Sequence, residues 1–120
     1  MSYDCSLLDP DTKEVLEVSF ITGVNGGTQV MGGTNRLWLN VTYNYTDSLR
    51  KAFEVETGLW SLKDVTAKAS RQVLMDAIGR LSGEPDDDYW KDTEGNARHA
   101  LIGLLTLSMH APDEAIWEIS

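Results

Sequence analysis

The chain has 120 residues, 42% of them hydrophobic, and a formal net charge of −9 at pH 7. A chain of this size can bury a core without disulfides, so we expect one domain over residues 1–120. Its ten Lys and Arg residues are scattered, which argues against direct binding of nucleic acid. No apolar run is long enough to cross a bilayer, the start lacks a signal-peptide pattern, and Cys5 is the single cysteine. We therefore expect a cytoplasmic protein with no membrane association.

Two strands with a turn between them are expected near the start. Residues 3–8 and 14–20 are rich in strand-forming side chains. Asp9-Pro10-Asp11-Thr12 between them has the composition of a turn. The pattern predicts a hairpin.

A glycine-rich segment follows, from Ile21 to Asn35. It contains two similar hexamers, VNGGTQ and VMGGTN, whose glycines are Gly26, Gly27, Gly32 and Gly33. No GKS or GKT follows them, and a strand rather than a helix is expected next, so a phosphate-binding loop is disfavoured. Two interpretations stay open: a mobile loop that orders on a ligand or partner, and a long hairpin connection that extends the two strands.

The next segment, Leu37 to Tyr45, alternates between apolar and polar side chains. Alternation with period two predicts a strand with one buried face. The polar row contains Trp38, Asn40, Thr42 and Asn44. We expect this row to lie opposite the helices, where it faces water or a binding partner.

Three helices and a last strand complete the expected elements. The helices span about 47–55, 66–81 and 94–109, and Thr66 and Thr93 cap the second and third. The third is apolar nearly all round, which predicts burial of Leu101, Leu104 and Leu105. With a strand at 115–119, the order predicts an α+β fold: an antiparallel sheet of about four strands with three helices packed on one face.

The sequence lacks a recognisable catalytic or metal-binding pattern. His99 and His110 lie eleven residues apart on the third helix, which separates them by roughly 16 Å at 1.5 Å per residue. No metal-ligand spacing and no G-x-S-x-G elbow occurs. We expect no metal and no cofactor, and an enzyme of unknown class is the least favoured interpretation.

An acidic segment with two aromatic residues, EPDDDYWKD, spans Glu84 to Asp92. One interpretation is a solvated loop. The other is a docking site in which Asp86, Asp87, Asp88 and Tyr89 meet an arginine-rich groove and Trp90 is the buried anchor. The net charge is likewise typical either of a soluble protein or of one with a basic partner.

Three segments carry a resemblance: NVTYNYTD (40–47), DYWKDTEGNARHAL (88–101) and APDEAIW (111–117). In them the chain resembles small proteins of bacteria, phages and prophages, which share an N-x-T-Y-N strand, an acidic-aromatic loop and a helix with a G-N-A-like start. The resemblance implies an origin in a mobile element and a single α+β domain, with no catalytic residue to transfer. Small acidic phage proteins include inhibitors of host defence, anti-CRISPR proteins among them, but this step is an analogy of size and charge.

The leading hypothesis is a non-catalytic counter-defence inhibitor in the host cytoplasm that occupies a basic surface of a host protein. Its contact residues would be the polar row of the 37–45 strand and the acidic loop. The first alternative is a small-molecule or nucleotide-signal binder that uses the glycine-rich segment and the Asn/Thr face. A homodimer is also left open.

Overall fold

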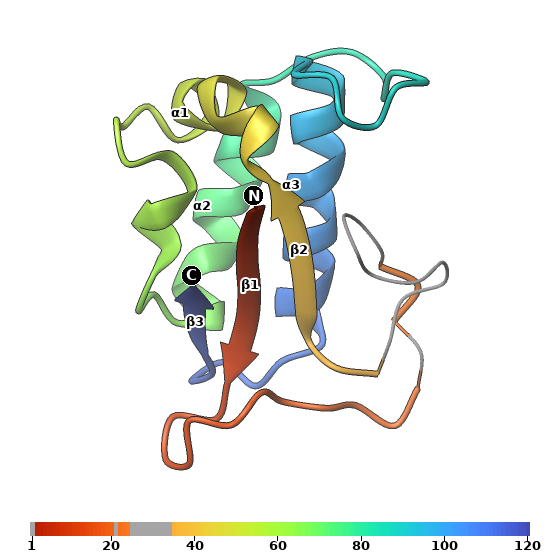
Figure 1. Ribbon diagram of the computed structural model, residues 1–120. Helices are drawn as coiled ribbons and strands as arrows, with labels where there is room; N and C mark the ends of the chain where they lie inside the picture. The colour runs from red at the N-terminus through yellow and green to blue at the C-terminus, as the bar shows by residue number, and fades with distance from the viewer. Residues whose placement is uncertain (1, 21, 25–34) are drawn as a thin grey trace.

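The computed structural model describes residues 2–20, 22–24 and 35–120. Within them the chain forms an α+β fold with three strands and three α-helices (Figure 1). The strands are β1 (Ser2–Leu8), β2 (Trp38–Thr42) and β3 (Ile116–Ile119), and the helices are α1 (Thr46–Phe53), α2 (Ala67–Gly79) and α3 (Glu94–Met109). Short 3₁₀ helices, η1 (Tyr43–Tyr45) and η2 (Gly58–Leu62), flank α1. No helix of the described part is long and apolar enough to cross a membrane.

The sheet is antiparallel, with the strand order β2-β1-β3. Cys5 of the central strand is paired with Leu39 on one side and with Ile119 on the other. The last strand therefore lies at an edge of the sheet. Its outer side is covered by the segment before α2, where the Trp117 N–H donates to the Val65 carbonyl at 2.9 Å.

The expected fourth strand, Glu14–Phe20, does not form. The turn before it is confirmed, because the Asp9 carboxylate accepts the Asp11 N–H at 2.8 Å. Beyond the turn, the segment makes only isolated bridges, Leu8 to Val15 and Glu17 to Arg36. β1 already pairs with β2 from Ser2 to Ser6, so the segment meets β1 only at its last residues, after the pairing with β2 ends.

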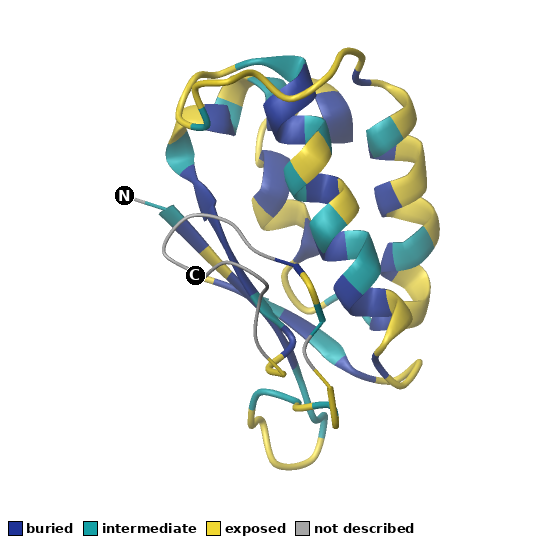
Figure 2. Cartoon of the chain, turned by 90° about the vertical axis from the view of Figure 1, so that its right-hand side faces the viewer, coloured by how far each residue is buried: buried dark blue, intermediate teal, exposed yellow. Residues whose placement is uncertain are grey.

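All three helices cover the same face of the sheet (Figures 1 and 2). This inner face carries Cys5, Leu7, Leu39 and Trp117, each at most 2% exposed. The Trp117 indole N–H donates to the Ser70 hydroxyl of α2 at 2.8 Å, which satisfies its buried polar atom. The core therefore lies between one sheet face and the helix layer, as the order of elements predicts.

The helix caps agree with expectation, but the helix surfaces are less buried than expected. The Thr66 hydroxyl accepts the Ala69 N–H at 3.2 Å, and the Thr93 hydroxyl accepts the Asn96 N–H at 3.0 Å. Leu101 and Leu104 are fully buried, whereas Leu105 is only partly buried. Exposed apolar side chains on α2 and α3 include Val73 (41%), Ile102 (37%) and Met109 (64%). The side of α2 and of α3 that faces away from the core remains in solvent.

The strand expected at Leu37–Tyr45 is shorter, because its last three residues turn into η1. The Thr42 hydroxyl accepts the Asn44 N–H at 3.2 Å, and the Thr46 hydroxyl donates to the Tyr43 carbonyl at 2.6 Å. Such side-chain bonds to the backbone compete with a strand ladder. Thr46 accordingly lies inside the first turn of α1 and does not cap it.

The two interpretations of the glycine-rich segment, a mobile loop and a long hairpin connection, concern residues that mostly lie outside the described part. Gly26, Gly27, Gly32 and Gly33 lie outside the described residues. The segment is described only at Thr22–Val24 and at Asn35, where the Asn35 carbonyl accepts the Val18 N–H at 2.8 Å.

Candidate functional site

The polar row of β2 does not form one open surface, contrary to expectation. Asn40 is 5% exposed and Thr42 only 2%. The Asn40 amide donates to the Ser2 hydroxyl at 2.7 Å and to the Asp4 carboxylate at 2.8 Å, so its partners on β1 enclose it. Thr42 is occupied in capping η1. Neither side chain is available to a ligand in this arrangement.

The other two members of the row remain accessible. Trp38 is half-buried on the outer face, across from Ser6. Asn44 is exposed, and its amide donates to the Trp90 carbonyl at 2.8 Å. A contact of Trp38 with a partner stays a prediction, whereas Asn44 belongs structurally to the acidic loop.

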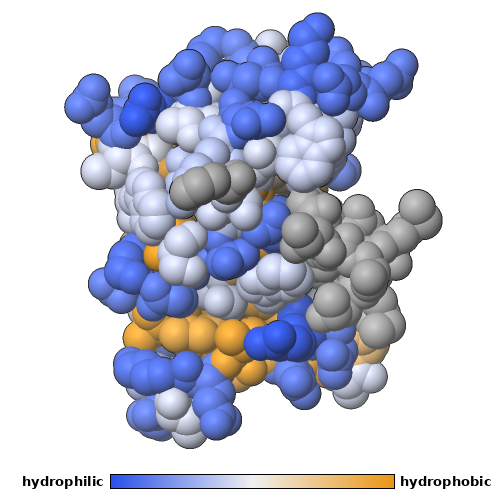
Figure 3. All heavy atoms as spheres, viewed as in Figure 1, coloured by the Kyte–Doolittle hydropathy of each residue, from blue (hydrophilic) through white to orange (hydrophobic). Residues whose placement is uncertain are grey.

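The outer face of the sheet divides into two zones (Figure 3). Apolar atoms gather at its lower end, where the cross-strand neighbours Ile116, Leu8 and Val15 lie in one row. Polar side chains of β1 and β2, such as Asp4 and Asn40, stand opposite each other higher up. Asp4 is exposed, but Asn40 is not.

The acidic loop, residues 84–92 between α2 and α3, is held by one buried side chain. Asn96 is 5% exposed. Its amide donates to the carbonyls of Asp88 and Lys91, both at 2.9 Å, and its oxygen accepts the Asp86 N–H at 2.8 Å. A single side chain at the start of α3 thus fixes the backbone at three points of the loop.

The neighbouring glycine lets the loop lie directly on the helix. A Cβ atom at Gly95 would lie 2.0 Å from the carbonyl oxygen of Glu84. That approach is far inside van der Waals contact, so only glycine fits there without a shift of the backbone. Gly95 and Asn96 together form the docking point of the loop on α3.

The other side of the loop is tied to η1 and α1. The Tyr45 hydroxyl donates to the Tyr89 carbonyl, and the Ser48 hydroxyl donates to the Asp92 carboxylate at 2.8 Å. Tyr45 is 1% exposed. Burial, followed by Tyr89 and the carboxylates of Asp88 and Asp92, raises the pKa of the Tyr45 phenol. The phenol therefore stays protonated and keeps donating.

The loop presents its charged and aromatic side chains to solvent. The Asp86 carboxylate accepts the Asp88 N–H at 2.8 Å, and the Asp88 carboxylate accepts the Trp90 N–H at 3.1 Å. These two acids shape the loop, whereas the exposed Asp87 shows no such bond to the described residues. Trp90 is 52% exposed, and its ring contacts that of Tyr89 at 4.8 Å between centroids.

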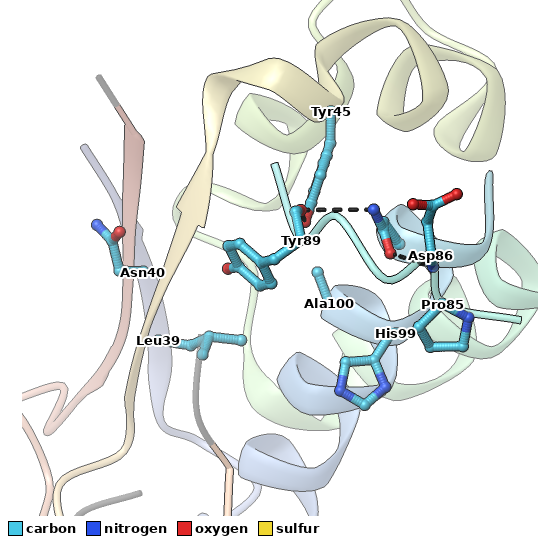
Figure 4. Close-up of a pocket in the computed structure, with 9 residues that line it drawn as sticks. Leu39, Asn40, Tyr45, Pro85, Asp86, Tyr89, His99 and Ala100 are labelled. Atoms are coloured by element: carbon cyan, nitrogen blue, oxygen red, sulfur yellow. Dashed lines mark hydrogen bonds between the residues drawn. The ribbon is translucent and has the colours of Figure 1, made fainter. Parts of the chain in front are cut away.

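A hollow of about 170 Å³ lies between β2, α3 and the acidic loop. We call it the Tyr89 hollow. Figure 4 shows Leu39, Tyr89 and Ala100 turned toward this space, whereas Asn40 points to the other side of β2. The lining residues are Leu39, Asn40, Tyr45, Pro85, Asp86, Tyr89, Asn96, His99 and Ala100.

A second hollow of about 320 Å³ adjoins it and shares Leu39 and His99. Its wall includes Thr22, Gly23 and Val24, at the start of the glycine-rich segment.

The described part offers neither a reactive thiol nor a cluster of metal ligands. The Cys5 side chain is fully buried, and burial raises the pKa of its thiol, as does Asp4 to a lesser extent. A protonated, enclosed thiol is a poor nucleophile. No group of three potential metal ligands occurs among residues 2–20, 22–24 and 35–120.

Sequence reasoning missed the two residues that organise the site. In the sequence, Gly95 and Asn96 stand out only as part of a G-N-A-like helix start. The signal was present, because a glycine in the first turn of a helix is unfavourable without a packing reason.

No family model, no curated protein and no solved structure matches the chain.

Proposed function

We propose that the chain is a non-catalytic binding protein whose acidic loop docks onto a basic surface of a protein partner. The observation that carries the proposal is a fixed loop that exposes Trp90 beside Asp87. The bonds of Asn96 hold its backbone without a partner present. A preorganised loop loses less conformational entropy on binding than a flexible loop does.

The negative charge of the acidic loop indicates the kind of partner surface that it would bind. Residues 84–92 contain five carboxylates, and their one cation, Lys91, lies 4.0 Å from the Asp86 carboxylate. With a net charge of −9 for the whole chain, long-range attraction favours a partner rich in Lys and Arg. An exposed tryptophan among charges is the type of residue that most often dominates a protein interface.

The biological setting of the proposal follows the resemblance. A counter-defence inhibitor in the cytoplasm of a host cell would act by this mode, with the loop covering a groove that normally holds nucleic acid. This setting stays a prediction from size, charge and the three resembling segments.

Affinity capture from the natural host tests the proposal. The baits are the wild-type chain, Trp90→Ala, and Trp60→Ala as a control tryptophan that is 40% exposed outside the loop. A protein captured by wild type and Trp60→Ala should bind Trp90→Ala roughly thirtyfold more weakly, since truncating an anchor costs about 2 kcal/mol or more. Equal capture by all three baits, unchanged by salt, would rule out the loop as the contact.

A small-molecule binder is the second candidate. The hollow beside Thr22–Val24 has a volume of about 320 Å³, at the lower end of the roughly 300–1,000 Å³ typical of ligand pockets. The expected contact through Asn40 and Thr42 is not available, because both are buried. An ultraviolet-absorbing compound that copurifies with the chain would favour this candidate.

A further inference from the structure

We propose that the Tyr89 hollow receives one ring-sized apolar side chain of the protein partner. This inference rests on the proposed function and adds the chemistry of the contact. The partner would present an apolar ring flanked by basic residues, with the ring in the hollow and the cations at the acidic loop.

The size of the hollow selects a single side chain. Its volume is about 170 Å³, close to the roughly 150 Å³ of apolar cavities that bind benzene. It is smaller than the roughly 300 Å³ at which pockets for nucleotide-sized ligands begin. A side chain that enters from a partner surface is the matching occupant.

Apolar side chains supply most of the wall of the hollow, and Asp86 and His99 add polar atoms to it. Leu39, Pro85, Ala100 and the ring of Tyr89 supply the surface (Figure 4). Asn96, the polar residue behind the loop, already uses both ends of its amide. An apolar group in the hollow would therefore displace water without leaving the amide of Asn96 unpaired.

The hollow is preformed and continuous with the exposed anchor. The bond from the Tyr45 hydroxyl to the Tyr89 carbonyl holds the wall in place. The Tyr89 ring lines the hollow and also contacts the ring of Trp90, 4.8 Å away between centroids. One partner segment can therefore cover Trp90 and enter the hollow at once.

The first experiment uses toluene as the probe, because it is apolar and of ring size. We expect a saturable change in the methyl NMR signals of Leu39, which all variants retain, during titration of the full chain. Ala100→Met fills the hollow from α3 and should abolish the change, whereas Ala69→Met on the exposed surface of α2 should not. No saturable change in wild type, or an unaltered change in Ala100→Met, overturns the inference.

The second experiment uses the same variants as baits for the captured partner. Ala100→Met should lower capture at least tenfold while Ala69→Met captures normally, and Ala100→Leu repeats the test if the methionine variant melts early. Toluene binding with unchanged capture by Ala100→Met overturns the docking inference and leaves the proposed function intact. Toluene binding with no protein captured by wild type overturns both and makes the hollow a site for a free aromatic molecule.

Discussion

The side-chain oxygen of Asn96 accepts a hydrogen bond from the backbone N–H of Asp86 at 2.8 Å. This bond joins the first turn of α3 to the most acidic part of the chain, ten residues earlier. Because Asn96 is buried, the bond is shielded from competing water. The candidate contact surface thus depends on a buried side chain whose amide is already fully used within the protein.

Removal of this side chain should loosen the loop and lower stability. Asn96→Ala leaves the partly buried N–H of Asp86 and the carbonyls of Asp88 and Lys91 without their partner. We expect a loss of about 1–3 kcal/mol in the free energy of unfolding, measured in urea. Amide exchange at 86–91 should accelerate. Asn44→Ala, which removes one exposed bond to Trp90, is the control and should cost less than about 1 kcal/mol.

Two helical glycines should respond oppositely to alanine. Gly95→Ala places a methyl group 2.0 Å from the Glu84 carbonyl oxygen, so we expect destabilisation and a displaced loop. Gly79→Ala meets no atom within 4 Å and should stabilise by up to about 1 kcal/mol through helix propensity. Thermal melts of both variants measure whether each substitution lowers or raises the melting temperature. A stabilised Gly95→Ala would show that Glu84 does not lie against the helix.

The core prediction concerns α3. Leu104 is fully buried, and Leu104→Ala should cost roughly 2–5 kcal/mol. Ile102 is on the same helix but 37% exposed, so Ile102→Ala should cost clearly less. Denaturant melts compare the free energies of unfolding of the two variants. Equal losses would show that Ile102 is as buried as Leu104.

Stability should fall at alkaline pH. Burial raises the pKa of Cys5 above its ordinary 9.0 and, with Tyr89, that of Tyr45 above 10.0. Above those ordinary values the unfolded chain releases protons that the folded chain retains, so the free energy of unfolding decreases as pH rises. Urea melts from pH 8 to 11 should show the decline beginning near pH 9. Cys5→Ala and Tyr45→Phe should each make the free energy of unfolding fall less steeply with pH.

The fold class was predictable because periodicity and caps are local signals. Thr66 and Thr93 cap the helices that the sequence predicts from them. The failure of residues 14–20 to form a fourth strand was not predictable, because a run of strand-forming residues does not reveal whether a sheet edge is free to pair with it. Val15 meets Leu8 only where β1 ends.

The exposed residues of the candidate site were predictable, but the buried residues that hold the acidic loop in place were not. The acidic run and Trp90 are visible as composition, and both are exposed. Alternation placed Asn40 on the outer face, yet could not show that Ser2 and Asp4 enclose it. Which buried amide holds which loop depends on tertiary contacts that no single-sequence pattern encodes.

The last prediction separates the charge of the loop from its shape. Replacement of Asp86, Asp87 and Asp88 by Asn removes three negative charges. Asparagine keeps a side-chain oxygen that can accept the N–H of Asp88 and of Trp90. The melting temperature should therefore change little, while the association rate with the captured partner falls.

The matched control removes the same charge through Asp11→Asn, Glu14→Gln and Glu114→Gln, all exposed. These positions belong to the turn after β1 and the segment before β3, which lie at the opposite end of the sheet from the acidic loop (Figure 1). This control should slow association much less, because exposed charges are screened beyond about 8–10 Å near physiological ionic strength. Stopped-flow mixing at several salt concentrations measures both triple variants. The loop variant should also lose most of the salt dependence seen in wild type. Equal slowing by the two variants would mean that overall charge, and not the acidic loop, directs the encounter.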